Sequence, residues 1–250
     1  KIGQYTCVYH LTYGTIFIVY FNIGAVNMKK QFIAVEGPIG VGKSSLAHKL
    51  SQTYKYYEEK EIITENPFLS DFYEDISKWS FQTEMFFLCN RYKQFQDLAL
   101  IENGIVSDYH IYKNRIFARN TLNESEFDKF NRIFNILTED LELPNMIIFL
   151  DADLDVLKRR IAKRNRSFEH QIEDSYLLNL KKDYLSFYET LKNDGANVIL
   201  IDTSDLDFVQ NESDYQLILN QIKPRGRGSG LQSAGVAGAT VPFVGLSSSF

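Results

Sequence analysis

Cysteine is scarce in this sequence, which has only Cys7 and Cys89 among its 250 residues. Two cysteines are too few for a disulfide framework, so we expect a reducing, cytoplasmic location. Cys89 falls in an apolar helical stretch, where a buried core thiol is expected. An excess of basic residues is also lacking, because 27 basic and 32 acidic side chains give a formal net charge of −5. That balance argues against general binding to nucleic acid or to acidic membranes.

Long hydrophobic runs are lacking as well. The apolar, aromatic run at residues 11–23 is too short to cross a bilayer as a helix. It has neither the basic start nor the small-residue cleavage site of a signal peptide, so we expect residues 1–27 to be an extension outside the core. Residues 225–250 are rich in Gly, Ser and Ala, which predicts a flexible, low-complexity tail. The functional domain is then expected at residues 28–224.

The middle of the chain alternates short apolar runs with longer helical patterns. Because such alternation is typical of parallel sheets with right-handed crossovers, we expect a doubly wound α/β fold with a five-stranded parallel sheet. Ligands of such folds bind beyond the carboxyl ends of the strands, so the residues that follow each strand are of most interest. The expected strands are residues 32–35, 61–64, 104–107, 146–150 and 198–201, and the expected helices are residues 44–54, 81–101, 124–141, 154–164 and 172–191.

A glycine-rich turn follows the first expected strand and precedes the first expected helix. It matches G-x-x-x-x-G-K-S, the P-loop pattern, in the strand–turn–helix context that phosphate binding needs. The glycines allow backbone N–H groups to surround a phosphate, and the helix dipole favours the anion. Lys43 adds a catalytic positive charge, and the Ser44 hydroxyl can hold Mg²⁺. The residues expected to bind the nucleotide are Gly37, Pro38, Ile39, Gly40, Val41, Gly42, Lys43, Ser44 and Ser45.

Acidic residues follow the second and third expected strands. Pro67 forces a turn on Asn66 and so holds Glu65 at the strand's edge. A carboxylate at that place can accept the proton of an attacking hydroxyl, although a charge at a helix N-terminus is the alternative interpretation. Asp108 follows the third strand, where a carboxylate commonly serves Mg²⁺; a helix cap is the alternative for it.

Basic residues are concentrated at positions 158–166. Arg160 and Arg164 are i, i+4 neighbours on one helical face, and Arg166 follows just beyond them. Arginines that converge on a transferring phosphoryl group stabilise its charge. Alone, this run would predict a solvated face or an RNA-binding patch. Beside a P-loop, we interpret it as a catalytic lid over the phosphates, with Arg164 also contacting the nucleotide.

An aromatic-rich helix at residues 79–91 carries three polar exceptions, Gln82, Glu84 and Arg91. Flat nucleobases are bound by aromatic rings that stack on them and by one or two polar groups that recognise the base edge. Most of the helix is expected to be core, but its polar residues are candidates for base recognition.

Together these motifs resemble those of the deoxynucleoside kinase family, which contains deoxyguanosine, deoxyadenosine and deoxycytidine kinases. The resemblance implies a P-loop NTPase-type fold with an Arg-rich lid, and phosphoryl transfer from ATP or another nucleoside triphosphate, with Mg²⁺, to a 5′-hydroxyl. It also implies that Glu65 is the base, that the lid arginines clamp phosphate, and that two chains pack through helices as a dimer. The motifs that carry it are residues 37–45, Glu65-Asn66-Pro67, Phe81-Gln82-Thr83 and Arg160-Ile161-x-x-Arg164-x-Arg166-x-x-Glu169.

Two departures from the family pattern bear on the substrate. Many relatives have an arginine after the acidic residue of the third strand, where this sequence has Tyr109. In relatives a glutamine of this helix recognises the base. Its neighbouring residues match those of Gln82, but its distance of seven residues from the following arginine matches that from Glu84 to Arg91. A carboxylate there would accept from N1–H and N2–H₂ of guanine, which favours deoxyguanosine. The expected substrate-binding residues are Glu65, Gln82, Glu84, Arg91, Asp108 and Glu169.

Other functions stay open at this point. A kinase that prefers deoxyadenosine or deoxycytidine fits the same motifs. A nucleoside monophosphate kinase usually needs an arginine near the third strand, and residues 107–110 lack one. A nucleotide-binding regulatory subunit of a heterodimeric kinase is a third alternative, although the intact Lys43, Glu65 and Arg164 argue against it. We expect a homodimer, or a heterodimer with a related kinase, with a small-molecule deoxynucleoside substrate and neither nucleic acid nor membrane as partner.

Overall fold

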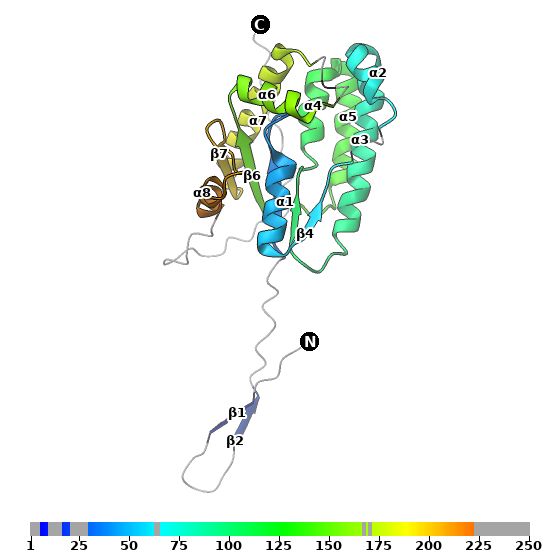
Figure 1. Ribbon diagram of the computed structural model, residues 1–250. Helices are drawn as coiled ribbons and strands as arrows, with labels where there is room; N and C mark the ends of the chain where they lie inside the picture. The colour runs from blue at the N-terminus through cyan, green and yellow to red at the C-terminus, as the bar shows by residue number, and fades with distance from the viewer. Residues whose placement is uncertain are drawn as a thin grey trace. The chain divides into compact units, whose positions relative to one another are not determined.

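Two separate units make up the chain (Figure 1). In the first, residues 1–30, the strands β1 (Thr6–Tyr9) and β2 (Phe17–Tyr20) pair antiparallel. The second unit begins at Gln31 and contains every other described element. The structure is a computed structural model, and it describes residues 6–9, 17–20, 30–62, 66–166, 169 and 172–222.

A five-stranded parallel sheet forms the centre of the second unit, as the sequence predicted. Its side chains alternate in direction, so neighbouring positions on one strand serve opposite faces. Ile33 and Val35 belong to one core cluster, whereas Phe32 and Ala34 belong to two other clusters. In order across the sheet the strands are β4 (Tyr57–Glu59), β5 (Ile105–Ser107), β3 (Phe32–Glu36), β6 (Met146–Asp151) and β7 (Val198–Asp202).

Strand β4 lies earlier in the chain than the prediction of residues 61–64. It pairs in parallel with β5, and the N–H of Tyr57 donates to the carbonyl of Gly104 at 2.8 Å. The apolar pair at positions 62–63 suggested the later strand, but backbone pairing with β5 sets the register of this edge strand. As a consequence, Glu61 comes two residues after the strand and lies at the carboxyl end of the sheet.

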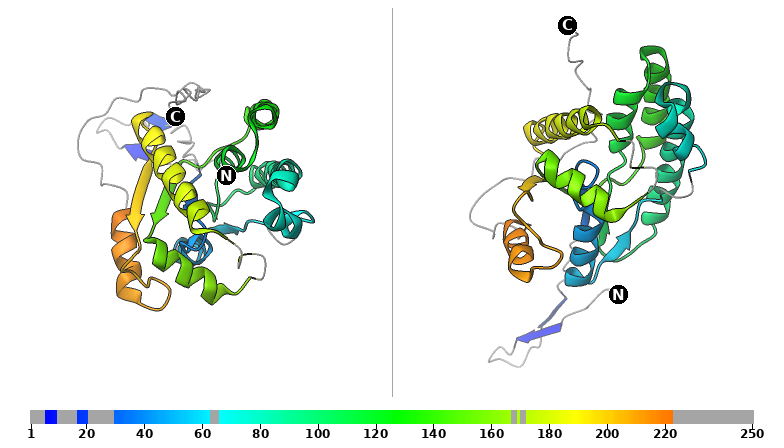
Figure 2. Two further views of the ribbon diagram at one scale, coloured as in Figure 1. Left: turned by 90° about the horizontal axis from the view of Figure 1, so that it is seen from above. Right: turned by 45° about the horizontal axis from the view of Figure 1, so that its top comes forward.

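Eight helices of the described ranges surround the sheet (Figures 1 and 2), and five of them match the predicted helices within a few residues. Within those ranges none has both the length and the apolarity that a membrane span needs. They are α1 (Lys43–Tyr54), α2 (Leu69–Glu74), α3 (Ile76–Leu98), α4 (Lys113–Thr121), α5 (Glu124–Thr138), α6 (Leu154–Arg164), α7 (Asp174–Asn193) and α8 (Glu212–Ile222).

Helices cover both faces of the sheet, and apolar stripes on them supply the core. Helices α1, α6 and α8 pack into the cluster that contains Ile33 and Val35. Helices α4 and α7 pack against the opposite face, into the cluster that contains Ala34. Helices α3 and α5 extend that face with a largely aromatic cluster around Phe95 and Phe130. This arrangement holds the loops at the carboxyl ends of the strands between two layers of helices.

Cys89 is exposed, so the prediction of a buried core thiol is wrong. It lies in α3 directly after Leu88, which is fully buried. One residue rotates an α-helix by about 100°, so adjacent positions face different directions. The apolar stretch is longer than the face that packs, and Cys89 falls outside that face.

Candidate active site

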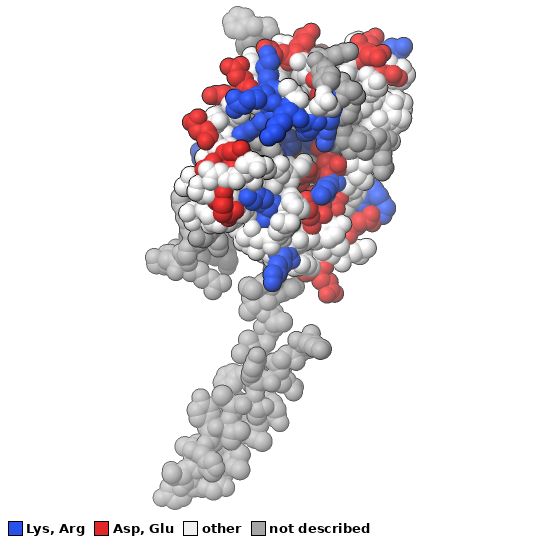
Figure 3. Space-filling model, in the orientation of Figure 1, with Lys and Arg blue, Asp and Glu red and all other residues white. Residues whose placement is uncertain are grey.

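A cavity of about 840 Å³ lies beyond the carboxyl ends of β3 and β4. The P-loop, Glu61, residues from α2, α3, α4, α6 and α7, and residues 204–210 beyond β7 line it. This is the place where open parallel sheets bind ligands. Lys and Arg side chains gather over α6 (Figure 3), so the cavity is basic beside the P-loop.

The P-loop has the backbone geometry that its glycines allow. Gly37, Gly40 and Gly42 have φ angles of 143°, 85° and 106°, which other residues rarely adopt. The turn brings Nζ of Lys43 to within 2.8 Å of the Gly37 carbonyl oxygen. Burial lowers the pKa of Lys43 to about 8. Lys43 is the first residue of α1. A phosphate bound at this helix N-terminus would raise the pKa of Lys43 again and further favour its charged form.

We expect Gly37→Ala to destabilise the fold by more than ~3 kcal/mol, because a steric clash adds to backbone strain. A Cβ at Gly37 would lie 2.3 Å from the carbonyl oxygen of Leu150, a backbone atom that cannot rotate away. Gly195 is a matched control, since it also has positive φ but no atom within 4 Å of an added Cβ. Gly195→Ala should cost only ~1–2 kcal/mol. Urea unfolding of both variants measures the difference, and equal losses would show that the contact with Leu150 is not limiting.

Ser44 and Asp108 meet beside the P-loop. The Ser44 hydroxyl donates a hydrogen bond to Asp108 Oδ2, and the backbone N–H of Glu61 donates to Asp108 Oδ1 at 2.8 Å. The Asp108 carboxylate thus joins the P-loop to the segment after β4. It does not cap α4, whose N-cap Tyr112 makes no side-chain cap. Among the described residues no cluster of three or more His, Cys, Asp or Glu side chains is suited to a metal ion.

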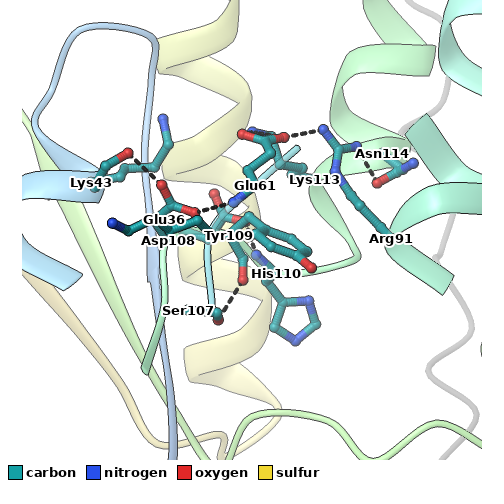
Figure 4. Close-up of polar contacts among 12 residues, drawn as sticks. Glu36, Lys43, Glu61, Arg91, Ser107, Asp108, Tyr109, His110, Lys113 and Asn114 are labelled. Atoms are coloured by element: carbon teal, nitrogen blue, oxygen red, sulfur yellow. Dashed lines mark hydrogen bonds and ion pairs between the residues drawn. The ribbon is translucent and has the colours of Figure 1, made fainter. Parts of the chain in front are cut away.

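Glu61 is the central carboxylate of the cavity, and the sequence did not predict it as a site residue. Nζ of Lys113 donates to both of its oxygens at 2.8 Å, and Arg91 donates to Oε1 (Figure 4). Arg91 also donates to Oδ1 of Asn114. Burial alone would raise the pKa of Glu61, but Lys113 and Arg91 outweigh burial and hold that pKa well below its usual range. The carboxylate therefore stays ionised at neutral pH.

Lys113 places a cation beside Glu61 that the sequence did not predict. Tyr109, which stands where many relatives have an arginine, is fully buried and packs 5.7 Å from the ring of Phe95. Lys113 comes four residues later, at the start of α4, and its ammonium reaches Glu61 from there. Sequence spacing gives no signal for this contact, because it depends on how α4 meets the segment after β4. Glu65, the predicted base, lies in residues 63–65, outside the described residues.

The other end of the cavity is formed by α3 and by aromatic side chains. Glu84 lines it and is buried, whereas Gln82 is exposed and outside the lining. Two residues along a helix rotate the side chain by about 200°, so only one of the two candidates can face the cavity. Glu84 and Arg91 both line the cavity and Gln82 does not, which favours Glu84 over Gln82 as the residue that recognises the base. The aromatic residues of the lining at this end are Phe72, Tyr73, Phe87, Phe117 and Tyr176, and Phe208 lines the cavity beside the P-loop.

The predicted lid arginines divide into two groups. Arg164 and Arg166 both reach Glu169, through a hydrogen-bonded ion pair and a longer pair of 3.6 Å respectively. The Glu169 side chain is only 4% exposed, and those of the two arginines are about a third exposed. Glu169 thus holds both guanidinium groups at the mouth of the cavity, where they remain accessible to a ligand.

Arg160 does not join that group. Its guanidinium donates to the carbonyl of Val41 at 3.1 Å, to the hydroxyl and carbonyl of Thr203 at 3.0 and 2.8 Å, and to the carbonyl of Leu206 at 3.0 Å. These bonds connect the P-loop turn to the loop after β7. The side chain lies in the cavity wall, but protein acceptors already occupy its terminal nitrogens in this structure.

The family model described as deoxynucleoside kinase matches residues 33–225. The chain belongs to the deoxynucleoside kinase family. A deoxyguanosine kinase of Bacillus subtilis (strain 168) is 46% identical over 198 residues, which cover 77% of this chain and 96% of that protein. A deoxyguanosine kinase of Dictyostelium discoideum is 32% identical over 206 residues, which cover 79% of this chain and 70% of that protein. The structure of a deoxyadenosine kinase from M. mycoides with bound dATP matches with a TM-score of 0.68 and 27% identity, covering 78% of this chain and 100% of that one.

As a deoxynucleoside kinase the protein is a phosphotransferase, and a nucleotide is its phosphoryl donor. The α/β fold with its parallel sheet and the family resemblance that the motifs indicated are both confirmed. The cavity brings together the P-loop, the arginines of the lid and the base-reading candidate Glu84, which lie far apart in the sequence.

Proposed function

We propose that this deoxynucleoside kinase transfers the γ-phosphoryl group of ATP to the 5′-hydroxyl of a purine deoxynucleoside, with deoxyguanosine as its best substrate. The observation that carries this proposal is one cavity with two chemically distinct ends. One end has the P-loop and basic side chains, and the other has aromatic rings around a buried carboxyl group. A triphosphate suits the first end and a nucleobase suits the second, so the two reacting groups would meet between them.

The phosphate end supplies positive charge to the transferring group. Lys43 and the helix N-terminus of α1 would bind the donor phosphates, and Arg164 and Arg166 would reach them from the lid. Ser44 and Asp108 present adjacent oxygen ligands, which suit Mg²⁺ because this ion is usually held by few protein oxygens and by substrate phosphates. When bound, Mg²⁺ neutralises charge on the donor phosphates.

Glu61 is the group we propose to accept the hydrogen bond of the 5′-hydroxyl. It lines the cavity, stays ionised and is held by Lys113 and Arg91 between the two ends. Because phosphoryl transfer has a loose transition state, orientation of the hydroxyl matters more than early removal of its proton. A carboxylate of low pKa serves that purpose. The sequence favoured Glu65, which stays a prediction and is compared with Glu61 by experiment below.

Sugar binding is proposed at the boundary between the two ends. Glu169 lines the cavity beside the lid arginines and can accept a hydrogen bond from a sugar hydroxyl. The Tyr73 ring lines the same region. In this arrangement a bound sugar would help to hold Glu169, and through it Arg164 and Arg166, in place.

Base recognition is proposed for Glu84. Its carboxylate offers two acceptors, which match N1–H and N2–H₂ on one edge of guanine. The similarity to deoxyguanosine kinases of two organisms supports this preference. A deoxyadenosine/deoxycytidine kinase of Bacillus subtilis (strain 168) is 28% identical over 202 residues, so that preference is the principal alternative.

Glu84→Gln should shift kcat/KM away from deoxyguanosine and towards deoxyadenosine or deoxycytidine. The amide can donate to one position of the base edge, whereas a charge-assisted hydrogen bond to guanine is lost, worth ~1.5–3 kcal/mol or roughly tenfold to a hundredfold in selectivity. Gln82→Ala is the matched control on the same helix and should leave the preference unchanged. If neither substitution alters the ratio among substrates, the base is recognised elsewhere.

A direct screen tests the proposed function. The purified full-length chain is incubated with labelled ATP, Mg²⁺ and each of the four deoxynucleosides in turn, and the monophosphate product is measured. Deoxyguanosine should give the highest kcat/KM. Turnover of deoxynucleoside monophosphates alone would instead indicate a monophosphate kinase, and turnover only after addition of a related kinase chain would indicate a regulatory subunit.

Two further expectations belong to this proposal. We expect a homodimer, which light scattering of the purified chain measures, with a heterodimer as the alternative. We also place the enzyme in the cytoplasm, where nucleoside triphosphates are available and the thiols of Cys7 and Cys89 would remain reduced.

A further inference from the structure

Glu84 has one carboxyl oxygen without a hydrogen-bond partner in the described structure. The residue is 2% exposed and lines the cavity from α3. Its Oε1 accepts from the hydroxyl of Thr121 at 3.4 Å, and its Oε2 is buried with no partner. Since buried polar atoms are normally satisfied, this oxygen is placed to bind a group that enters the cavity.

The charged groups around Glu84 form ion pairs with one another. Arg91 on α3 and Lys113 on α4 both bind Glu61, which carries the opposing negative charge. The Tyr73 hydroxyl on α2 and the Tyr176 hydroxyl on α7 also face it, and both stay neutral because burial raises their pKa. Burial therefore dominates at Glu84: it raises the pKa to about 7, although Arg91 and Thr121 lower it.

The two protonation states of this carboxyl group suit different bases. Ionised, it has acceptors only and matches the donors N1–H and N2–H₂ of guanine. Protonated, it has one donor and one acceptor, which match the N1 acceptor and the N6–H₂ donor of adenine. The N3 acceptor and N4–H₂ donor of cytosine have the same pattern. An ionised carboxylate facing adenine would leave two acceptors opposed, at N1 and on the carboxylate.

We propose that the proton on Glu84 selects the nucleobase, so that one site takes deoxyguanosine when Glu84 is ionised and deoxyadenosine when it is protonated. The inference rests on the proposed function, because it assumes that the base lies at Glu84. It goes further because the base preference of the enzyme would then change with pH. Deoxyguanosine then releases a proton from the protonated fraction on binding, and deoxyadenosine takes one up.

A competition assay gives a sharp test. The full-length kinase receives equal concentrations of deoxyadenosine and deoxyguanosine with ATP and Mg²⁺, from about pH 6 to about pH 8.5, and the ratio of the two monophosphates is measured. Because both substrates use the same P-loop, lid and Glu61, titration of those groups cancels in the ratio. The ratio of deoxyadenosine to deoxyguanosine product should fall ~10-fold for each unit of rising pH.

Two variants identify the group responsible. Glu84→Gln cannot titrate, and its ratio should be independent of pH. Glu59→Gln is the matched control, since burial also raises the pKa of Glu59, to about 6, but this residue lies in β4 outside the lining. Its ratio should fall with pH as steeply as that of the wild type. A slope that persists in Glu84→Gln, or a wild-type ratio that does not change with pH, would overturn the inference.

Calorimetry without a phosphoryl donor gives a second measurement that does not depend on turnover. Binding of each nucleoside to the wild-type enzyme is measured near pH 7 in two buffers of different ionisation enthalpy. Proton release with deoxyguanosine and uptake with deoxyadenosine support the inference, and the same sign for both contradicts it. Failure to phosphorylate any deoxynucleoside would instead count against the proposed function, so the two failures are distinguishable.

Discussion

Glu61→Gln is expected to lower kcat by roughly 10²–10⁴-fold while deoxynucleoside binding survives. The glutamine keeps the size of the side chain, but it removes the ionised acceptor that would orient the 5′-hydroxyl. It also leaves the buried Lys113 ammonium without the carboxylate that it binds at 2.8 Å, so some loss of stability should accompany the loss of rate. Single-turnover rates, nucleoside binding and urea unfolding together separate the two effects.

Glu65→Gln is the matched comparison, because the sequence predicted that residue as the base. If Glu61 acts as proposed, Glu65→Gln retains kcat near that of the wild type. The opposite result, a large loss in Glu65→Gln with Glu61→Gln nearly active, would restore the assignment drawn from the sequence. The pH profile adds a third criterion: since the pKa of Glu61 lies well below its usual range, kcat should show no acid limb from Glu61 in the mildly acidic range.

Arg164→Ala should lower kcat by ~10²–10³-fold, with a smaller effect on deoxynucleoside affinity. The guanidinium is positioned by Glu169 at the mouth of the cavity, and it would meet charge that develops on the transferring phosphoryl group. An increase in KM for the nucleoside alone would make Arg164 a substrate contact and would contradict the lid assignment.

Arg160→Ala is expected to give a different result, although both arginines belong to α6. Its hydrogen bonds to Val41, Thr203 and Leu206 fix the P-loop turn against the loop after β7. Loss of these bonds should mainly raise KM for ATP and lower the free energy of unfolding. A kcat effect as large as that of Arg164→Ala, with unchanged KM and stability, would show that Arg160 leaves its carbonyl acceptors to contact phosphate during turnover.

The parts of the site that the sequence predicted are short and contiguous. The P-loop is one segment whose glycines, lysine and serine stand at fixed spacing, and its geometry is local. The parallel sheet follows from the alternation of apolar runs with helical patterns, and four of its five strands fall where those runs lie. Arg164, Arg166 and Glu169 also lie within one short segment, so the resemblance of the motif was sufficient to group them.

The remaining residues depend on contacts between segments that are distant in the chain. Glu61 was missed because pairing with β5, and not the apolarity of positions 62–63, determines where β4 ends. The rotation of α3 in the packed structure turns Glu84 towards the cavity and Gln82 towards solvent, although both are polar residues of one apolar helix.

Lys113 and Arg160 show that the sequence also does not reveal which partners a charged side chain contacts. In the sequence, Lys113 is an ordinary helix residue and Arg160 belongs to a basic run. In the structure, Lys113 binds Glu61 from another element, and carbonyl groups of two loops hold Arg160. A motif gives the residue type and its approximate place. Only the packing of helices on the sheet determines which buried charge a side chain meets, because that depends on distances in space that sequence separation does not specify.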